Sequence, residues 1–137
     1  MGVSGGLFLS RHGGGLAGVD VSLRHRYFTV GGFYEAEQGY RGAGDVVGGL
    51  VGVSLAPTEA LRVDVQGLAG ARAGESPLFG LRACVSLRAG ASAFATGGFC
   101  AFARRVSVSA ADAVNGVSRD DNLFVGVTMR VGAGFDL

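Results

Sequence analysis

Lysine and tryptophan are absent from this chain, and charge and long apolar runs are scarce. All 12 basic residues are arginine, 17% of the residues are charged, and the formal net charge is +1. Because a water-facing surface usually carries both lysine and arginine, this composition is unusual for a soluble domain. The lack of an apolar run of about 18 residues excludes a transmembrane helix. The small net charge predicts no attraction to nucleic acid.

Proline and cysteine are also rare, with two of each, whereas glycine is abundant at 26 of 137 residues. The length fits one domain over residues 1–137. The opening MGVSGGLFLS lacks the charged region and the cleavage site of a signal peptide, so an exported protein would have lost its signal. The glycine pairs match no phosphate-binding loop, and the cysteines match no metal-ligand spacing. We therefore expect neither a cofactor nor a metal.

Apolar residues recur at every second position through most of the chain. In the final stretch, one row is wholly apolar from Leu123 to Leu137, and the intervening row mixes glycine, polar and charged residues. Period-two alternation is the signature of a β-strand, and helical spacing is absent. The alternation predicts eight strands, near Val3–Arg11, Ala17–Arg24, Phe28–Glu37, Val47–Leu55, Leu61–Ala69, Phe79–Arg88, Ala93–Arg104 and Asn122–Leu137.

A repeated tripeptide groups these strands into hairpins. VSL occurs at Val21–Leu23, Val53–Leu55 and Val85–Leu87, 32 residues apart, and VTM follows at Val127–Met129. A repeat of this length holds two strands and two connections, although a common β-tripeptide also recurs by chance. Short connections follow the tripeptides. The connections at the opposite end are longer and glycine-rich: His12–Gly15, Gln38–Asp45, Ala71–Pro77 and Val106–Asp121.

These features predict an all-β fold, an eight-stranded antiparallel up-and-down barrel with both termini at the short-turn end. Closure of the barrel would remove the exposed strand edges. The apolar row carries no charge between the turns. The other row carries six arginines and five acids: Asp20, Arg24, Glu35, Glu37, Arg62, Asp64, Arg82, Arg88, Arg104, Arg130 and Asp136.

The favoured interpretation is a transmembrane barrel whose apolar row faces lipid. An arginine on the lipid face costs about 2–4 kcal/mol at the midplane, so the missing charge is what lipid contact requires. The lipid-facing residues would include Val21, Val51, Val65, Val85, Val127, Met129 and Phe135. The charged row would then fill a narrow lumen as a balanced network, with Asp64 and Arg82 as a candidate ion pair.

The alternative is a soluble barrel, similar to a lipocalin or streptavidin, with the apolar row turned inward around a ligand. Its water-facing surface would carry large phenylalanines, much glycine and no lysine, and would tend to aggregate. In contrast, a strand tilted by about 45° crosses a bilayer with roughly 9–11 residues, and a closed barrel pairs its backbone groups internally. The membrane interpretation is therefore preferred.

The strand count, the short turns at one end, the longer loops at the other and the terminal stretch FVGVTMRVGAGFDL resemble the small eight-stranded outer-membrane barrels of bacteria, of the OmpA or OmpX type. The resemblance covers the whole chain as architecture. The last strand is similar to the signal read by the outer-membrane assembly machinery, although Asp136 and Leu137 follow Phe135, where the family usually ends. The aromatic belt would be thin, with Phe28 and Phe135 near one rim and Tyr34 and Phe79 near the other.

The resemblance implies a location in the bacterial outer membrane. Membrane lipids and the assembly machinery are the expected partners, and the chain is expected to be a monomer. Because side chains fill an eight-stranded lumen, a wide pore is excluded and a structural or surface-interaction role is favoured.

We expect no enzymatic activity and no catalytic residues. Ser10 and His12 lie two positions apart on one face, and some outer-membrane barrels, such as the lipid A deacylases, act as hydrolases with a His-x-Ser pair beside a carboxylate. Here the order is reversed, and no acid that orients the histidine is assigned. A lipid hydrolase remains the alternative.

Cys84 and Cys100 are expected on the lumen side of neighbouring strands. An exported compartment is oxidising, which favours a disulfide, and such a bond needs Cα atoms within about 7 Å. If Arg88 faces Phe94 across the turn, then Cys84 faces Gly98 and Cys100 is its diagonal neighbour. Two free thiols are therefore the simpler interpretation, and a disulfide is the alternative that the sequence leaves open.

Overall fold

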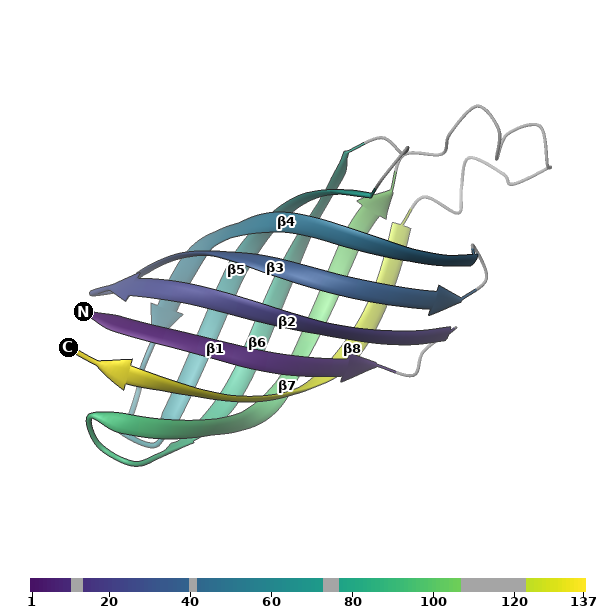
Figure 1. Ribbon diagram of the computed structural model, residues 1–137. Coiled ribbons are helices and arrows are strands. Elements are labelled where there is room, and N and C mark those ends of the chain that lie inside the picture. Colours follow the sequence, from purple (N-terminus) through teal and green to yellow (C-terminus); the bar gives the residue numbers. More distant parts are fainter. Residues whose placement is uncertain (11–13, 40–41, 73–76, 107–122) are drawn as a thin grey trace.

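Eight antiparallel strands form a closed barrel in the computed structural model of the chain (Figure 1). The structure describes residues 1–10, 14–39, 42–72, 77–106 and 123–137. The strands are β1 (Gly2–Ser10), β2 (Gly14–His25), β3 (Phe28–Gly39), β4 (Gly42–Leu55), β5 (Leu61–Arg72), β6 (Leu78–Ala89), β7 (Ala93–Val106) and β8 (Leu123–Asp136). Each strand pairs with the next in sequence, and β8 pairs with β1. The predicted all-β, eight-stranded antiparallel barrel is confirmed.

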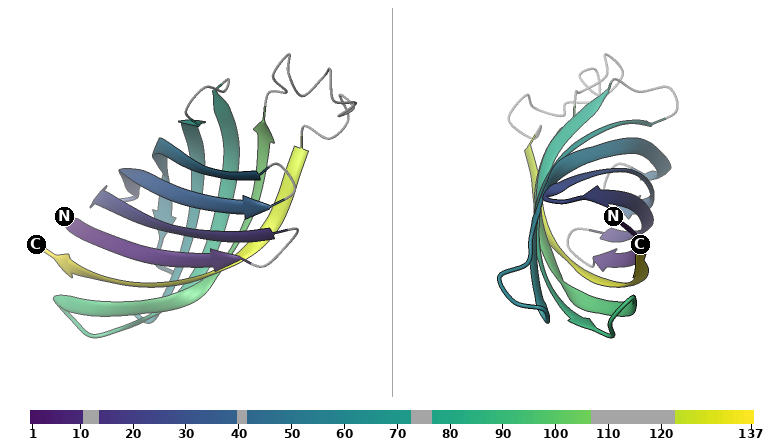
Figure 2. Two further views of the ribbon diagram at one scale, coloured as in Figure 1. Left: turned by 45° about the vertical axis from the view of Figure 1, so that its right-hand side comes forward. Right: turned by 90° about the vertical axis from the view of Figure 1, so that its left-hand side faces the viewer.

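The two termini lie side by side at one end of the barrel (Figures 1 and 2). The amide nitrogen of Leu137 donates to the carbonyl oxygen of Met1 at 2.7 Å. The connections β2–β3, β4–β5 and β6–β7 lie at this end too, as the sequence predicted, and we call it the short-turn end. Within the described residues, no helix is long and apolar enough to cross a membrane.

The pairing register tilts the strands. A path through paired residues starts at Ala95 on β7 and returns to β7 at Arg105, ten residues further along, by way of Ala133, Gly5, Val21, Gly32, Gly49, Ala69 and Phe79. With a rise of about 3.3 Å per residue and a strand spacing of about 4.8 Å, this stagger tilts the strands by about 40°. An eight-stranded barrel of this kind is just wide enough for side chains to fill.

Several strands are longer than the alternation predicted. β3 continues to Gly39 and β4 begins at Gly42, so the loop predicted over Gln38–Asp45 is wrong. Glycine has no side chain to mark a face, which is why the alternation is invisible in this stretch. The connection predicted over Val106–Asp121 falls outside the described residues beyond Val106, which ends β7.

The repeated tripeptide occupies every second strand, with one copy in each of β2, β4, β6 and β8. In each copy the central hydroxyl side chain points into the barrel, and its exposed fraction is between 3% and 6%: Ser22, Ser54, Ser86 and Thr128. The flanking residues point outward. The repeat unit is therefore one hairpin, because each 32-residue interval spans two strands.

The apolar row points outward and the charged row points inward. The seven residues expected to contact lipid are 51% to 64% exposed: Val21, Val51, Val65, Val85, Val127, Met129 and Phe135. Inside, Phe33, Val46, Leu50 and Leu68 form a buried apolar cluster. The soluble alternative places the apolar row inside, and the structure places it outside.

Two charged residues lie on the outer face at the end away from the termini. Asp45 on β4 and Arg105 on β7 are exposed, next to the buried inward-facing Val46 and Arg104. The sequence assigned these two charges to neither face, because its rows began at Val47 and ended at Arg104. Asp45 and Arg105 therefore place charge on the outer face at this end, where the apolar surface stops.

Candidate functional site

The lumen gathers most of the charged side chains and is the candidate functional site. Of the eleven charges expected there, six are buried: Asp20, Glu35, Arg62, Asp64, Arg82 and Arg104. Four are partly exposed: Arg24, Arg88, Arg130 and Asp136. The side chain of Glu37 lies outside what the structure describes.

Asp20 on β2 binds two arginines in the middle of the lumen. Its Oδ2 accepts a hydrogen bond from Arg82 Nη2 at 2.9 Å, and its Oδ1 accepts one from Arg130 Nη2 at 2.6 Å. Arg82 on β6 also donates to Gln66 Oε1 at 2.8 and 3.0 Å. We call Asp20, Arg82 and Arg130 the mid-lumen triad. Because β2 and β6 are four strands apart in a ring of eight, the Asp20–Arg82 pair spans the barrel diameter.

A second buried ion pair spans the lumen nearer the end away from the termini. Glu35 on β3 binds Arg104 on β7, and these two strands are also four apart in the ring. Arg104 lies over Phe102, with 5.3 Å between its Cζ and the ring centroid. The guanidinium is thus held by a carboxylate and an aromatic face, as a buried charge requires.

Asp136 on β8 repeats the two-arginine arrangement at the short-turn end. Its Oδ1 accepts a hydrogen bond from Arg24 Nη2 at 2.6 Å, and its Oδ2 lies 2.6 Å from Arg88 Nη1. We call Asp136, Arg24 and Arg88 the mouth triad. Arg88 also donates to the carbonyl oxygen of Ala91 in the β6–β7 turn. Its Cζ lies 4.0 Å from the ring centroid of Phe94.

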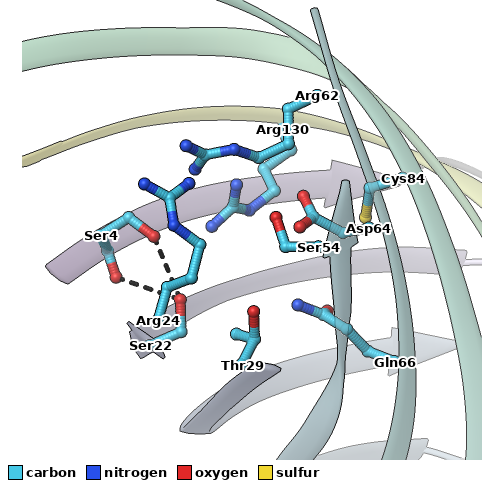
Figure 3. Close-up of a pocket in the computed structure, with 10 residues that line it drawn as sticks. All are labelled: Ser4, Ser22, Arg24, Thr29, Ser54, Arg62, Asp64, Gln66, Cys84 and Arg130. Carbon is cyan, nitrogen blue, oxygen red and sulfur yellow. Dashed lines mark hydrogen bonds between the residues drawn. The ribbon is translucent and has the colours of Figure 1, made fainter. Parts of the chain in front are cut away.

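Between the two triads, a group of polar side chains lines a small cavity (Figure 3). Arg62 also lies over the ring of Phe94, with 5.4 Å between its Cζ and the ring centroid. Asp64 lies directly opposite Ser54 across the β4–β5 ladder. The sequence paired Asp64 with Arg82, whereas the structure pairs Arg82 with Asp20 on the opposite wall. Such a partner depends on the stagger of all the intervening strands, which alternation does not encode.

Cys84 and Cys100 are joined by a disulfide on the lumen side of the β6–β7 ladder. Their Cα atoms are 4.0 Å apart, close to the spacing of directly opposed residues at a non-hydrogen-bonded position. Both side chains are buried. Of the two states that the sequence left open, the structure contains the disulfide.

The predicted register of the β6–β7 hairpin is wrong by two residues. Arg88 lies opposite Thr96 and not Phe94, which brings Cys84 directly opposite Cys100. Gly90, with φ +105°, begins the connection between β6 and β7. A shift of two residues keeps every side chain on its face, so the alternation is the same in both registers.

Cavities lined by residues that the structure describes occur inside the lumen and at its short-turn end. Two small ones, of about 20 Å³ and 10 Å³, lie among the buried charges. Each has room for about one water molecule. At the short-turn end a wider cavity of about 630 Å³ opens to the outside, and we call it the mouth. The charged side chains that line the mouth are Arg24, Arg26, Glu59, Arg62, Arg88 and Asp136.

Sequence reasoning missed the neutral polar side chains that complete the lumen. Thr29, Ser54, Gln66 and Ser86 are all buried there. The alternation shows that these side chains point inward. It does not show that Gln66 accepts hydrogen bonds from Arg82 or that Ser54 lies opposite Asp64. The mouth was missed as well, because its lining comes from three connections, the ends of several strands and Met1, which only closure of the barrel brings together.

No group of three or more His, Cys, Asp or Glu side chains in the described ranges could hold a metal ion. The side chain of Ser10 and the whole of His12, on which the hydrolase alternative rests, lie outside the described residues. The geometry that is described consists of guanidinium donors held by carboxylates, amides and aromatic rings. Compared with known proteins, the chain matches no family model, no curated protein and no solved structure.

Proposed function

We propose that this chain is an integral β-barrel of the bacterial outer membrane, in contact with membrane lipids and monomeric, with a structural or surface-interaction role. The observation that carries the proposal is a continuous apolar outer face around a charged interior. A protein in water gains by the reverse arrangement, since burying apolar surface is the main favourable term in folding. In lipid, the arrangement seen here is the stable one.

The height of the apolar face supports this proposal. On β7 the outward row carries no charge from Ala93 to Ala103, a span of ten residue steps. At about 3.3 Å per step and a tilt of about 40°, this row rises about 25 Å along the barrel axis. Outer-membrane barrels carry an apolar band of about this height.

Polar and aromatic residues limit the apolar face at both ends. Asp45 and Arg105 lie at one end, and His25, Arg26 and Glu59 are exposed at the short-turn end. Aromatic side chains accompany these charges. Tyr34 hydrogen-bonds Asp45, and Phe79 pairs with Arg105 across the β6–β7 ladder. At the short-turn end Phe28 and Phe135 are exposed. Aromatic side chains favour the interface between lipid and water, where such girdles occur in barrels.

The filled interior supports a role other than transport. The triads, the Glu35–Arg104 pair and the apolar cluster occupy the lumen, and its two inner cavities hold about one water molecule each. We propose that the protein is no wide pore and has no catalytic role, and that the assembly machinery of the outer membrane recognises β8 during insertion. Planar-bilayer recordings should show no large, stable conductance steps.

The decisive experiment places arginine on the outer face. Val51→Arg, Val65→Arg, Val85→Arg and Val127→Arg, made singly, should each lower the free energy of unfolding in lipid vesicles by about 2–4 kcal/mol where the site is near the midplane. The matched control is Ala56→Arg in the exposed β4–β5 connection, which should cost less than about 1 kcal/mol. Neutral results at all four sites, or a monodisperse protein without detergent, would contradict the membrane proposal.

A further inference from the structure

The mouth of the barrel carries more positive charge than its own carboxylates balance. Four arginines line it, against the two acids Glu59 and Asp136. Asp136 is shared between Arg24 and Arg88, so these two cations already divide one carboxylate. Arg62, together with Arg24 and Ser54, also lines the small cavity below, so these three side chains lie between the mouth and the lumen.

Arg62 is the unusual member of this group. The residue is 7% exposed, and its Nε is buried without a hydrogen-bond partner. Among the described residues Arg62 makes no ion pair, and its guanidinium makes a cation–π contact with the Phe94 ring. A buried charge is costly unless it is paired and hydrogen-bonded. An anion bound at this position would therefore stabilise the guanidinium of Arg62.

We propose that the mouth is a binding site for a phosphate group, with Arg62 as its deepest donor and Arg24 and Arg88 at its sides. In Figure 3 the guanidinium groups of Arg24, Arg62 and Arg130 converge on one space, and Asp64 lies across that space from them. Arg130 is already bound by Asp20. Arg62 is therefore the group in this cluster whose charge is available to a ligand.

The volumes of the cavities determine how far into the barrel a phosphate group can enter. The inner cavity of about 20 Å³ has room for about one water molecule and cannot admit a phosphate group. The mouth, at about 630 Å³, admits one together with the group that carries it. The phosphate would therefore stop at the level of Arg62, with its oxygens facing the guanidinium groups from the outside.

The donors around the mouth are held in place before a ligand arrives. Arg88 is fixed by Asp136, the Ala91 carbonyl oxygen and the Phe94 ring. Arg24 is fixed by Asp136. Planar guanidinium groups match phosphate oxygens with paired hydrogen bonds, and groups that are already ordered lose less freedom when the ligand binds.

Calorimetric titration of inorganic phosphate into the barrel, refolded in a phosphate-free non-ionic detergent, tests this site. Chloride holds the ionic strength constant. The wild-type protein should bind phosphate saturably at one site. Arg62→Gln should weaken that binding at least tenfold, whereas Arg105→Gln, which removes an exposed arginine at the other end, should leave it unchanged.

Arg88→Gln is the second test variant, because a partly exposed side chain is easier to remove without unfolding the barrel. It should also weaken binding, and it decides the question if Arg62→Gln does not fold. A short-chain phosphatidic acid, titrated in parallel, separates a lipid headgroup from dissolved phosphate as the source of the group. Binding of neither probe to the wild type, or wild-type affinity in the folded arginine variants, would overturn the site.

Discussion

Cys84 and Cys100 lie directly opposite each other on β6 and β7 and are joined by a disulfide inside the barrel. The bond closes a loop over a sequence separation of 16 residues, which in the chain-entropy view stabilises the fold by about 3 kcal/mol. The double variant Cys84→Ala/Cys100→Ala should therefore lose about 2–3 kcal/mol of unfolding free energy in urea titrations. The control is the wild type carried through an identical titration. Equal stabilities would show that the bond contributes nothing.

The burial of both sulfurs predicts resistance to reductant. A thiol reagent added to the folded barrel should leave the bond intact, and the same reagent in urea should reduce it, because reduction requires access to a sulfur atom. Thiol alkylation followed by mass measurement distinguishes the two states. Full reduction of the folded protein would contradict the buried position.

The two triads predict different costs for the loss of their carboxylates. Asp20→Asn removes the charge of the carboxylate that Arg82 and Arg130 share in the buried lumen, and it should cost about 3–5 kcal/mol of unfolding free energy. Asp136→Asn is the matched change at the mouth, where the side chain is 34% exposed and water screens the arginines. It should cost about 1 kcal/mol or less. Equal costs would mean that burial does not set the strength of these contacts.

Gly98 lies against the neighbouring strand so closely that it admits no side chain. A Cβ there would collide with the carbonyl oxygen of Val85 and lie 2.9 Å from Ser86 Cβ. Gly98→Ala should cost about 1–3 kcal/mol, because the wall must shift to accept the methyl group. Gly97→Ala is the control, since a Cβ at Gly97 meets nothing within 4 Å. A neutral Gly98→Ala would contradict the close approach of β6 and β7.

Arg26 opens the two-residue β2–β3 turn with φ 54°, a conformation that favours glycine. Hairpin turns with a positive φ at the first central position usually carry glycine there. Arg26→Gly should therefore raise the unfolding free energy by about 0.5–1 kcal/mol. Tyr27→Gly, at the next position, has no such strain to relieve and should lower it. Loss of stability in Arg26→Gly would show that the arginine side chain matters more than its backbone.

The eight strands were predictable because each one has an apolar outer face and a polar inner face. Side chains therefore alternate in character along the strand, as Val21 and Leu23 on the outside alternate with Ser22 on the inside. The strand ends were not predictable where glycine occupies the row, as at Gly42–Gly44 in β4. Because glycine has no side chain, its identity does not indicate whether the position faces inward or outward.

The register of the strands and the contacts between lumen side chains could not be predicted from the alternation, for a different reason. The register assumed from the sequence for β6 and β7 differs from the one in the structure by two residues, and both put the same residues on the same faces. The Asp20–Arg82 contact joins residues 62 apart in sequence and depends on the stagger accumulated over the strands between them. The two-arginine pattern around Asp136 has the same origin, since the barrel must close before β8 lies near β2, which carries Arg24.

The Asp20–Arg82 and Glu35–Arg104 pairs cross the barrel along two different diameters, from β2 to β6 and from β3 to β7. A cylindrical wall one strand thick resists stretching through its hydrogen bonds, but it flattens easily into an oval. Because β2 and β3 are neighbours, as are β6 and β7, the two diameters are one strand position apart, and each pair limits the change in barrel width along its own diameter. The pairs therefore restrict flattening of the cross-section along these two directions.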